Sequence, residues 1–452
     1  MTVAIIFFVG FVLAVVVGQV LKINPGIVAI ALGFILFWIF GGKDGAIGAS
    51  SGFIQLFPAK LFWNYAIPVI FYAFAAANGT LNVLGRKIVY VFRNARWALP
   101  FAIFLVAVIV AVAGAGTMNT FIVAPLAWGL CVAAGVTPYI VVVALWCGSF
   151  VGAFMPWTSN GALTIGMYEQ FLPGLDGVAM QGRVAIYYAI LALIFLAVMY
   201  VLTKAWKPID YKEKYGLDVE QIDSNTMEKP GSFNKHQIAT LVIIFACIAL
   251  LLVPAVINQF APSAPMKWAS SNLTIPVTSV LGISLVAIFG GKSIKEVFAS
   301  DVNWNMIFLI TGMGMYCALA VPLGVVDSLG GAMQGLDPRF IGPILCLVGA
   351  ALSFVTSAST VQPLLFTIIA ALAPVTGLDY SAMVVPMMIG VGVTSFSPIS
   401  TGGAAGLIGA PKGIPEKLFV YQLVTAVVLM VLAVLLAFTP IYSFLPAIAV
   451  VG

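Results

Sequence analysis

Charge, histidine and clustered cysteine are scarce in this sequence, and each shortage excludes a class of protein. Only 8% of the 452 residues are charged, whereas soluble globular domains carry about 25%. His236 is the one histidine, which leaves no partner for a histidine-based metal site, catalytic triad or proton relay. The five cysteines lie in apolar runs, at spacings that match no transition-metal or redox motif. We therefore expect no cofactor, no transition metal and no nucleic-acid partner.

Long apolar runs dominate instead. Hydrophobic residues make up 62% of the chain and the mean hydropathy is +1.13. Runs of about 20 residues, the length of a helix that crosses a bilayer, recur from end to end, whereas membrane barrels show alternating segments of about 10 residues. The first run, residues 3–21, has neither a basic leader nor a small-residue cleavage site, so we expect a retained span. The predicted fold class is an all-α polytopic membrane protein.

A polar stretch that breaks helices occurs twice, 242 residues apart. Residues 154–162 read Phe-Met-Pro-Trp-Thr-Ser-Asn-Gly-Ala, and residues 396–404 read Phe-Ser-Pro-Ile-Ser-Thr-Gly-Gly-Ala. Proline removes a backbone donor, and glycine tolerates the dihedral angles at which a chain leaves a helix. We therefore expect broken helices over residues 138–170 and 380–410. In lipid such breaks survive only inside protein or beside a watery cavity, and a matching pair points to the binding site of a transporter.

Two further segments are predicted to be re-entrant hairpins. Residues 98–135 form two apolar arms of about 15 to 18 residues, marginal for a full crossing, around a polar tip at 117–120. Residues 338–373 repeat this pattern around a tip at 356–360. Each hairpin directly precedes one of the broken helices.

The chain is predicted to contain two copies of one plan. The first covers residues 1–203 and the second residues 238–452, and the hydrophilic linker between them, 204–237, holds six of the 15 acidic residues. Echoes such as Trp63-Asn64 and Trp304-Asn305 support the repeat. Each half has five spans, an odd number, so the second half must enter the membrane upside down. Inverted repeats around a midplane site are common among secondary transporters.

Lysine and arginine set the expected orientation. Of the 20 Lys and Arg residues, 15 fall on the side that holds the linker and five on the other side. The positive-inside rule then makes the linker side cytoplasmic. Both termini are expected to face outward from a bacterial-type inner membrane. The first hairpin would enter from the cytoplasm and the second from outside.

The two hairpin tips and the two breaks are predicted to meet at one site. They carry no formal charge, but helix N-termini aim free N–H groups at an anion, and freed carbonyls and hydroxyls suit a cation such as sodium. The residues predicted to bind substrate are Asn119, Thr120, Thr158, Ser159, Asn160, Ser357, Ser359, Thr360, Ser400 and Thr401. The residues predicted to bind the cation are Thr117, Asn119, Asn160, Gly161, Thr356, Ser357, Gly402 and Gly403.

Each of these residues also has a purely structural interpretation. Serine, threonine and glycine commonly pack between membrane helices, so any one alone is more often a packing residue, while four polar clusters in two copies favour binding. Asn119 and Asn160 are the strongest candidates, because an amide in mid-membrane is costly unless it is used. Trp63, Trp304 and the asparagines that follow them are expected at the membrane interface. Glu169 is expected there too, rather than as a coupling carboxylate.

Several motifs are similar to those of one transporter family. Phe57-Pro-Ala-Lys-Leu-Phe62, Ala77-Asn-Gly-Thr-Leu81 and the first hairpin resemble the malonate and dicarboxylate carrier branch of the divalent anion/sodium symporters (DASS), in the ion-transporter superfamily. The Ser-Asn-Thr tips of that family bind carboxylate and sodium. Here Met118-Asn119-Thr120 keeps the Asn-Thr pair, and the second tip has no asparagine. The resemblance implies a homodimer and an elevator mechanism, in which hairpins and broken helices move together against a scaffold.

The predicted function is secondary active transport of a small carboxylate, such as malonate or a four-carbon dicarboxylate, driven by sodium or protons. Its expected partners are that substrate, membrane lipid and a second copy of the chain. The alternative is a sodium/proton or oxyanion antiporter on the same scaffold, which would need a titratable group at the site. A membrane-embedded enzyme is not expected, because the sequence lacks paired intramembrane acids and a Cys/His couple.

Overall fold

The computed structural model of the chain is built from helices. It describes residues 2–41, 49–91, 96–216, 230–261, 263–332 and 335–443, and no strand occurs among them. Six of the described helices are long and apolar enough to cross a membrane, or seven if the bent pair Ala264–Asn272 and Ile275–Phe289 is one span. Seven further apolar helices have 10–17 residues. The prediction of an all-α polytopic membrane protein is confirmed.

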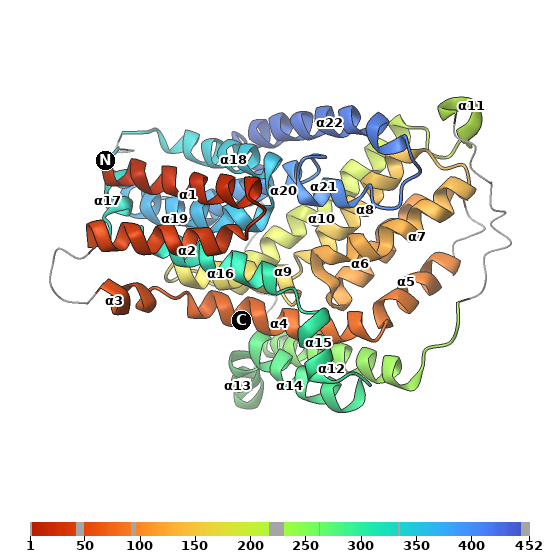
Figure 1. The fold of residues 1–452 in the computed structure, drawn as a ribbon, viewed down its shortest axis with the longest axis horizontal. Coiled ribbons are helices and arrows are strands. Elements are labelled where there is room, and N and C mark those ends of the chain that lie inside the picture. The colour runs from red at the N-terminus through yellow and green to blue at the C-terminus, as the bar shows by residue number, and fades with distance from the viewer. Residues whose placement is uncertain are drawn as a thin grey trace.

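The first part of the chain contains helices α1 to α11 (Figure 1). They are α1 (Thr2–Val20), α2 (Pro25–Leu36), α3 (Ala49–Gln55), α4 (Ala59–Ala77), α5 (Thr80–Val91), α6 (Leu99–Val110), α7 (Asn119–Ala133), α8 (Pro138–Ala153), α9 (Ser159–Phe171), α10 (Gly177–Leu202) and α11 (Tyr211–Tyr215). Four short turns of π or 3-10 type accompany them, namely η1 (Phe37–Gly41), η2 (Arg96–Ala98), η3 (Ala111–Ala115) and η4 (Gly116–Met118).

The second part of the chain contains helices α12 to α22. They are α12 (Lys235–Phe260), α13 (Ala264–Asn272), α14 (Ile275–Phe289), α15 (Ile294–Ser300), α16 (Trp304–Ala318), α17 (Val325–Ala332), α18 (Pro338–Val355), α19 (Ala358–Thr376), α20 (Tyr380–Thr394), α21 (Thr401–Ala405) and α22 (Ile414–Ala437). A 3-10 turn, η6 (Pro440–Ser443), follows the last of them.

Two apolar helices are interrupted at segments that contain proline. Pro156 lies between α8 and α9, and Pro398 lies between α20 and α21. Because proline has no N–H and clashes with the preceding turn, neither helix continues through it. Thr158 then starts α9 by accepting a hydrogen bond from the backbone N–H of Gly161, at 3.4 Å. Ser400 occupies the equivalent N-cap position before α21.

The pairs α6–α7 and α18–α19 are helical hairpins with polar tips. At the first tip, Gly116 has a φ of +52°, which favours glycine. A Cβ added there would lie 2.5 Å from Oγ of Ser159 and 2.8 Å from Oδ1 of Asn160, so the tip touches the first break. At the second tip, Thr356 and Ser357 are extended, with φ of −132° and −89°.

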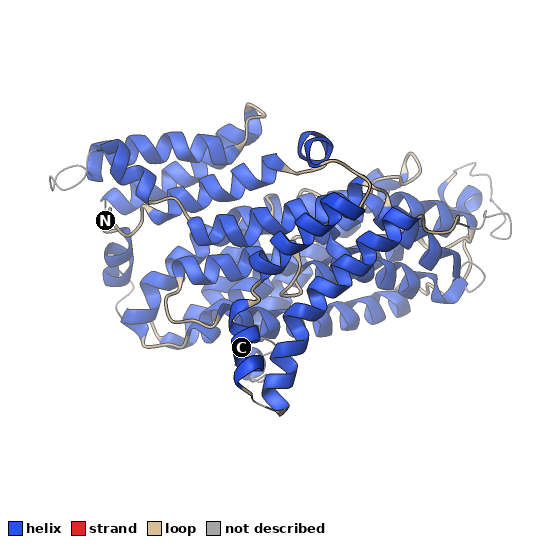
Figure 2. Ribbon diagram, turned by 90° about the horizontal axis from the view of Figure 1, so that it is seen from below, coloured by secondary structure: helices blue, strands red, loops and turns tan. Residues whose placement is uncertain are grey.

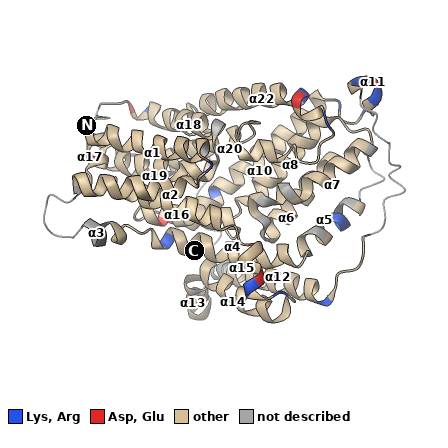
Figure 3. Ribbon diagram, in the orientation of Figure 1, with Lys and Arg blue, Asp and Glu red and all other residues tan. Residues whose placement is uncertain are grey.

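The two hairpins occupy opposite ends of the long axis of the molecule (Figure 1). Helices α6 and α7 share the right-hand end with α5 and α11, whereas α18 and α19 share the left-hand end with α17 and the N-terminus. Figure 2 shows from below that most helices run along this axis. The charged residues lie mainly at the ends and in outer loops, and the helices between them are nearly free of charge (Figure 3). The polar tips therefore point into the middle of an apolar body.

Helices from the two parts of the chain pack against each other through glycine. A Cβ on Gly26 of α2 would lie 2.2 Å from the carbonyl oxygen of Phe308, and one on Gly312 of α16 would lie 2.2 Å from the carbonyl oxygen of Gly26. Helix α14 meets α4 in the same way, because a Cβ on Gly282 would lie 2.4 Å from the ring of Phe71. Such close approach through small residues is typical of helices in membranes.

Part of the predicted linker lies outside the described residues, namely 217–229. Its first residues pack on the end of α7, where the N–H of Ile209 donates to the carbonyl of Gly135 at 2.9 Å and the hydroxyl of Tyr211 donates to that of Val136 at 2.7 Å. Lys43, Arg93 and residues 444–452 also lie outside the described part. The predicted sidedness of the chain stays a prediction.

Candidate functional site

A polar cavity lies where the two hairpin tips and the two breaks meet. It offers about 410 Å³ to the centres of water-sized molecules, whereas one water needs roughly 10–15 Å³ by that measure. The predicted residues that line it are Thr117, Thr120, Asn160, Thr356, Ser357, Ser359, Thr360, Ser400, Thr401 and Gly402. Four polar segments far apart in the sequence thus contribute to one cavity.

Each hairpin tip is hydrogen-bonded to the break that follows it in the sequence. At the first tip, Oδ1 of Asn160 accepts from the backbone N–H of Thr117 at 3.2 Å and from its hydroxyl at 3.5 Å. At the second tip, the hydroxyl of Ser400 donates to the carbonyl oxygen of Thr356 at 2.8 Å. The spacing along the chain is 43 residues in the first pair and 44 in the second. A tip-to-break contact thus occurs in both halves, but the tip donates in the first pair and the break donates in the second.

The second tip carries a cluster of hydroxyl groups. Oγ of Ser357 lies 2.6 Å from Oγ1 of Thr360 and 3.3 Å from Oγ of Ser359. Each hydroxyl can donate one hydrogen bond and accept others. The cluster can therefore present donors to an anion or acceptors to a cation by rotating its hydrogens.

Six described helices have a residue in their first turn that lines this cavity, namely α2, α7, α9, α16, α19 and α21. Thr120, Asn160 and Ser359 are three of these residues. None of the described lining residues is charged, so the field inside comes from backbone dipoles and hydroxyl groups. The free N–H groups of a helix N-terminus stabilise an anion by about 0.3–1 kcal/mol, and by up to about 2 kcal/mol where the site is partly buried. The arrangement suits a small anion accompanied by a cation.

Asn119 lies behind the cavity wall rather than in it. Its side chain is fully buried, and its amide N–H donates to the carbonyl oxygen of Ala107 at 2.5 Å. Its Oδ1 accepts from the hydroxyls of Ser149 at 2.5 Å and Thr120 at 3.1 Å. Asn119 therefore ties the two arms of the first hairpin to α8 and holds Thr120 and Ser149, which both line the cavity.

Four other predicted residues also lie beside the cavity without lining it. Thr158 is buried and donates to the carbonyl oxygens of Met155, at 2.8 Å, and Ala153. A Cβ on Gly161 would lie 2.0 Å from the carbonyl oxygen of Met155, and glycine is required for this close approach. The other two residues of this group are Ser159 and Gly403. They shape the ends of the broken helices.

Several lining residues were not predicted from the sequence. Ser149 comes from α8, Ser395 is the C-cap residue of α20, and Gln362 comes from the second turn of α19. Ser395 accepts the indole N–H of Trp146 at 3.1 Å. Ser149 is a single polar residue in an apolar run, whereas Ser395 directly precedes the predicted break and Gln362 lies two residues beyond the predicted tip.

Asn305 lines the cavity from the start of α16. The interfacial position expected for it, beside Trp304, stays a prediction. The side chain of Asn24 donates to Oδ1 of Asn305 at 2.7 Å and to its carbonyl oxygen at 2.6 Å. The neighbouring Trp304 faces outward and is 37% exposed. Consecutive residues of an α-helix point in directions about 100° apart, so Trp304 and Asn305 lie on different faces of α16.

Glu169 does not line the cavity. Its carboxylate lies on α9 and accepts from the side-chain amide of Asn64, on α4, at 3.4 Å. Asn64 also donates to the carbonyl oxygen of Lys60 at 3.0 Å. The acid therefore sits at the contact between α9 and α4, away from the four polar segments.

The N-terminal third of the sequence matches a family model. Residues 1–153 match the family model of the dicarboxylate carrier protein MatC N-terminus. The first third of this chain is MatC-like. The predicted resemblance to the malonate and dicarboxylate carrier branch is thereby confirmed. The matched MatC-like region runs from α1 to the last residue of α8, and so contains the whole first hairpin.

A solved transporter has a similar fold. The crystal structure of the Alcanivorax borkumensis YdaH transporter, described as having an unusual topology, superposes with a TM-score of 0.61. The match covers 93% of this chain and 98% of that chain, at 14% sequence identity. No curated protein sequence matches the chain. The first third of the chain is thus similar to a dicarboxylate carrier family, and the fold is similar to that of a solved transporter.

Proposed function

We propose that this chain is a cation-coupled secondary transporter of a small dicarboxylate, such as malonate or a four-carbon acid. The observation that carries the proposal is the uncharged polar cavity at which two tips and two breaks meet. The MatC-like N-terminal region supports the substrate class. Substrate and cation partly neutralise each other in this cavity, so neither needs a charged side chain.

The two ends of a dicarboxylate match the two tip–break pairs. Thr117, Thr120 and Asn160 surround one carboxylate, together with the N–H groups at the starts of α7 and α9. On the other side, the second carboxylate accepts from the hydroxyls that line the second tip and the second break. These hydroxyls belong to Ser357, Ser359, Thr360, Ser400 and Thr401.

The coupling cation binds among oxygen atoms of the same segments. A hard cation such as sodium prefers carbonyl, hydroxyl and amide oxygens, which helix breaks expose. Thr117 and Asn160 supply such oxygens on the first side, and Thr356, Ser357 and Gly402 on the second. The remaining predicted residues, Asn119, Gly161 and Gly403, hold these segments in place.

We propose alternating access between the two sides of the membrane. We infer two inverted repeats, residues 1–203 and 238–452, because the order of helices recurs and each half has a hydrogen bond between its hairpin tip and its break. The hairpins extend from opposite ends of the molecule, as inversion requires (Figure 1). The elevator motion and the homodimer are inferred from the resemblance to the symporter family.

Uptake into proteoliposomes tests the function. We expect labelled malonate or succinate to accumulate only under an inward sodium or proton gradient. Asn160→Ala and Ser357→Ala should lower uptake at least tenfold, whereas the control Ser284→Ala, at an exposed position of α14 away from the cavity, should leave it unchanged. Uptake that ignores every cation gradient and saturates with no carboxylate would refute the proposal.

A further inference from the structure

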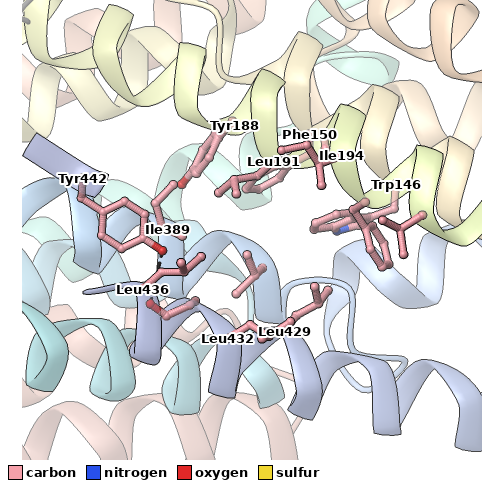
Figure 4. A pocket seen from close by; sticks show the side chains of 15 residues that line it. Trp146, Phe150, Tyr188, Leu191, Ile194, Ile389, Leu429, Leu432, Leu436 and Tyr442 are labelled. Carbon is pink, nitrogen blue, oxygen red and sulfur yellow. Dashed lines mark hydrogen bonds between the residues drawn. The ribbon is translucent and has the colours of Figure 1, made fainter. Parts of the chain in front are cut away.

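A second cavity is lined almost entirely by apolar side chains (Figure 4). It offers about 230 Å³ and is bounded by α8, α10, α20, α22 and Tyr442 of η6. Its lining is aliphatic and aromatic, as Figure 4 shows for Leu191, Leu429 and Leu436. Trp146 and Phe150 line both cavities. Two side chains thus separate the apolar crevice from the polar site.

The polar atoms in the wall of this crevice already have partners within the protein. The hydroxyl of Tyr188 donates to the carbonyl oxygen of Met388 at 2.6 Å, and that of Tyr442 donates to the carbonyl oxygen of Ala433 at 3.2 Å. The indole N–H of Trp146 donates to Ser395. The described wall therefore offers contacts to an apolar occupant and no free hydrogen bond to a polar one.

The mouth of the crevice opens on the most exposed helices of the described spans. Only 22% of α22 and 33% of α10 are buried within the spanning window, the two lowest values among the six long apolar helices. Three lining residues are about half exposed, namely Ile194 at 55%, Val198 at 47% and Leu432 at 49%. In a membrane protein such apolar, exposed faces are in contact with lipid.

We propose that the acyl chain of a bilayer lipid occupies this crevice and packs against the outer side of Trp146 and Phe150. An apolar cavity of this kind stays dry, and its lining lacks van der Waals partners until an apolar group fills it. The bilayer supplies such groups directly at the mouth, between α10 and α22. A hydrocarbon segment gains contacts there without breaking a hydrogen bond.

This lipid would touch the wall of the transport site through two residues. The rings of Trp146 and Phe150 are stacked, with centroids 5.0 Å apart and planes at 13°. Trp146 also meets Phe396 edge-on, at 5.3 Å between centroids, at the start of the second break. An acyl chain behind these rings holds them against the polar cavity, so the lipid is a structural component of its wall. The binding depends only on the chain being embedded in the membrane, and not on the identity of the transported substrate.

Photolabelling in vesicles tests the proposal. The full-length protein is reconstituted into phosphatidylethanolamine and phosphatidylglycerol vesicles with a small fraction of phosphatidylcholine that carries a diazirine in mid-acyl chain. After illumination, peptide mapping should place adducts within the crevice lining of α10 and α22, around residues 191–198 and 429–436. Labelling spread evenly over all exposed helices, or absent from these two segments, would overturn the proposal.

Filling variants make the test specific. Ala433→Leu and Ala192→Phe add bulk at two buried lining positions, which are 3% and 2% exposed. Each should reduce the number of crevice adducts at least threefold. Val424→Phe, at a 55% exposed position of α22 outside the crevice, is the matched control and should not reduce them. Equal loss of adducts in Val424→Phe would contradict a defined site. If a second copy of the chain covered the whole α10–α22 face and excluded the lipid probe from it, that result would also contradict the lipid site.

The result is independent of transport. Photolabelling needs no substrate and no gradient, so the crevice can fail the test while uptake is normal. Conversely, labelling at the crevice can succeed in a preparation that shows no carboxylate uptake, and the two proposals are then separated.

Discussion

Trp128 of the first hairpin donates its indole N–H to the main-chain oxygen of Gly406, beyond the second break, at 2.9 Å. The ring is fully buried, and 278 residues separate the two partners. Tyr188 and Trp146, in the first part of the chain, make comparable bonds to Met388 of α20 and to Ser395, the C-cap residue of that helix. The walls of the polar cavity are therefore joined across the two parts of the chain by directional bonds as well as by packing.

Trp128→Phe should destabilise the protein while preserving most of the packing. It leaves the buried carbonyl oxygen of Gly406 without its donor, which costs about 1–3 kcal/mol. A lowered melting temperature in detergent, with weaker stabilisation by substrate, is expected. Trp268→Phe, at a 65% exposed position, is the control and should change neither quantity. Equal effects of the two substitutions would argue against the hydrogen bond as the cause.

Gly116→Ala should abolish transport by forcing the first tip away from the first break. Its Cβ would meet Ser159 and Asn160 at under 3 Å. The backbone of Gly116, with φ of +52° and ψ of −137°, also lies where residues other than glycine are strained by about 1–3 kcal/mol. Gly377→Ala is the control, with φ of +66° and ψ of +8° in the left-handed helical region and nothing within 4 Å of an added Cβ. It should cost roughly 1–2 kcal/mol of backbone strain and retain uptake. Uptake rates are normalised to folded protein, and an equal loss of uptake in the two variants would argue against the tip-to-break contact as the cause.

Asn119→Ala and Asn160→Ala should differ in kind. Asn119 makes buried bonds to Ala107, Ser149 and Thr120, so its loss should lower stability by about 1–3 kcal/mol. Asn160 lines the cavity, so its loss should mainly remove the rise in melting temperature that substrate and cation produce. Thermal unfolding with and without malonate and sodium distinguishes the two. The opposite pattern, with Asn119→Ala stable but unable to bind, would place Asn119 in direct contact with ligand.

Gly26→Ala should destabilise the contact between α2 and α16. The added Cβ lies 2.2 Å from the carbonyl oxygen of Phe308, and overpacking of this kind costs about 1–3 kcal/mol. Gly129→Ala is the control, because nothing lies within 4 Å of its Cβ. That substitution should stabilise α7 by up to about 1 kcal/mol. Denaturing both variants in detergent measures the difference in their free energies of unfolding. A Gly26→Ala protein more stable than the wild type would refute the close contact.

Glu169→Gln should leave the pH profile of uptake unchanged. The carboxylate lies at the contact between α9 and α4 and does not line the cavity. Glutamine keeps the size and the acceptor oxygen that Asn64 uses, so folding should be preserved. Measured initial rates of wild type and variant across neutral pH should run parallel. Loss of the pH dependence in the variant would instead favour the antiporter.

The sequence predicted the helical membrane fold because lipid imposes strict conditions on it. Apolar runs of about 20 residues have few alternatives to a spanning helix, and Pro156 and Pro398 mark interruptions by their chemistry. The short helices α13, α15 and α17 were not predicted. They lie outside the long apolar runs, where neither segment length nor hydrophobicity predicts a helix. Local capping determines where they start, as the capping box of Ser293 and Glu296 does for α15.

The residues that line the cavity could be predicted only in part from the sequence. Polar clusters in the tips and breaks stood out, and ten of their residues line it. The sequence does not show which polar residues line the cavity and which support its wall. Asn119 and Thr120 are adjacent, and only the rotation of α7 about its axis determines that Thr120 lines the cavity and Asn119 does not. Ser149 was missed because it is a single polar residue in an apolar run, Ser395 because it directly precedes the predicted break, and Asn305 because its position in the cavity wall depends on tertiary neighbours. The assignment of substrate and cation among these residues stays a prediction.

The lack of charge on the described cavity wall determines how voltage acts on the proposed cycle. Moving one elementary charge across the membrane changes its energy by about 2.3 kcal/mol per 100 mV. The described residues that line the cavity carry no charge, so the unloaded cavity moves no side-chain charge through the field. Only the loaded step responds to the electric field, and it does so through the net charge of the cargo. A dianion that travels with two monovalent cations is electrically silent, and each additional cation adds one charge to the current. Current measured per substrate molecule therefore counts the coupling ions directly.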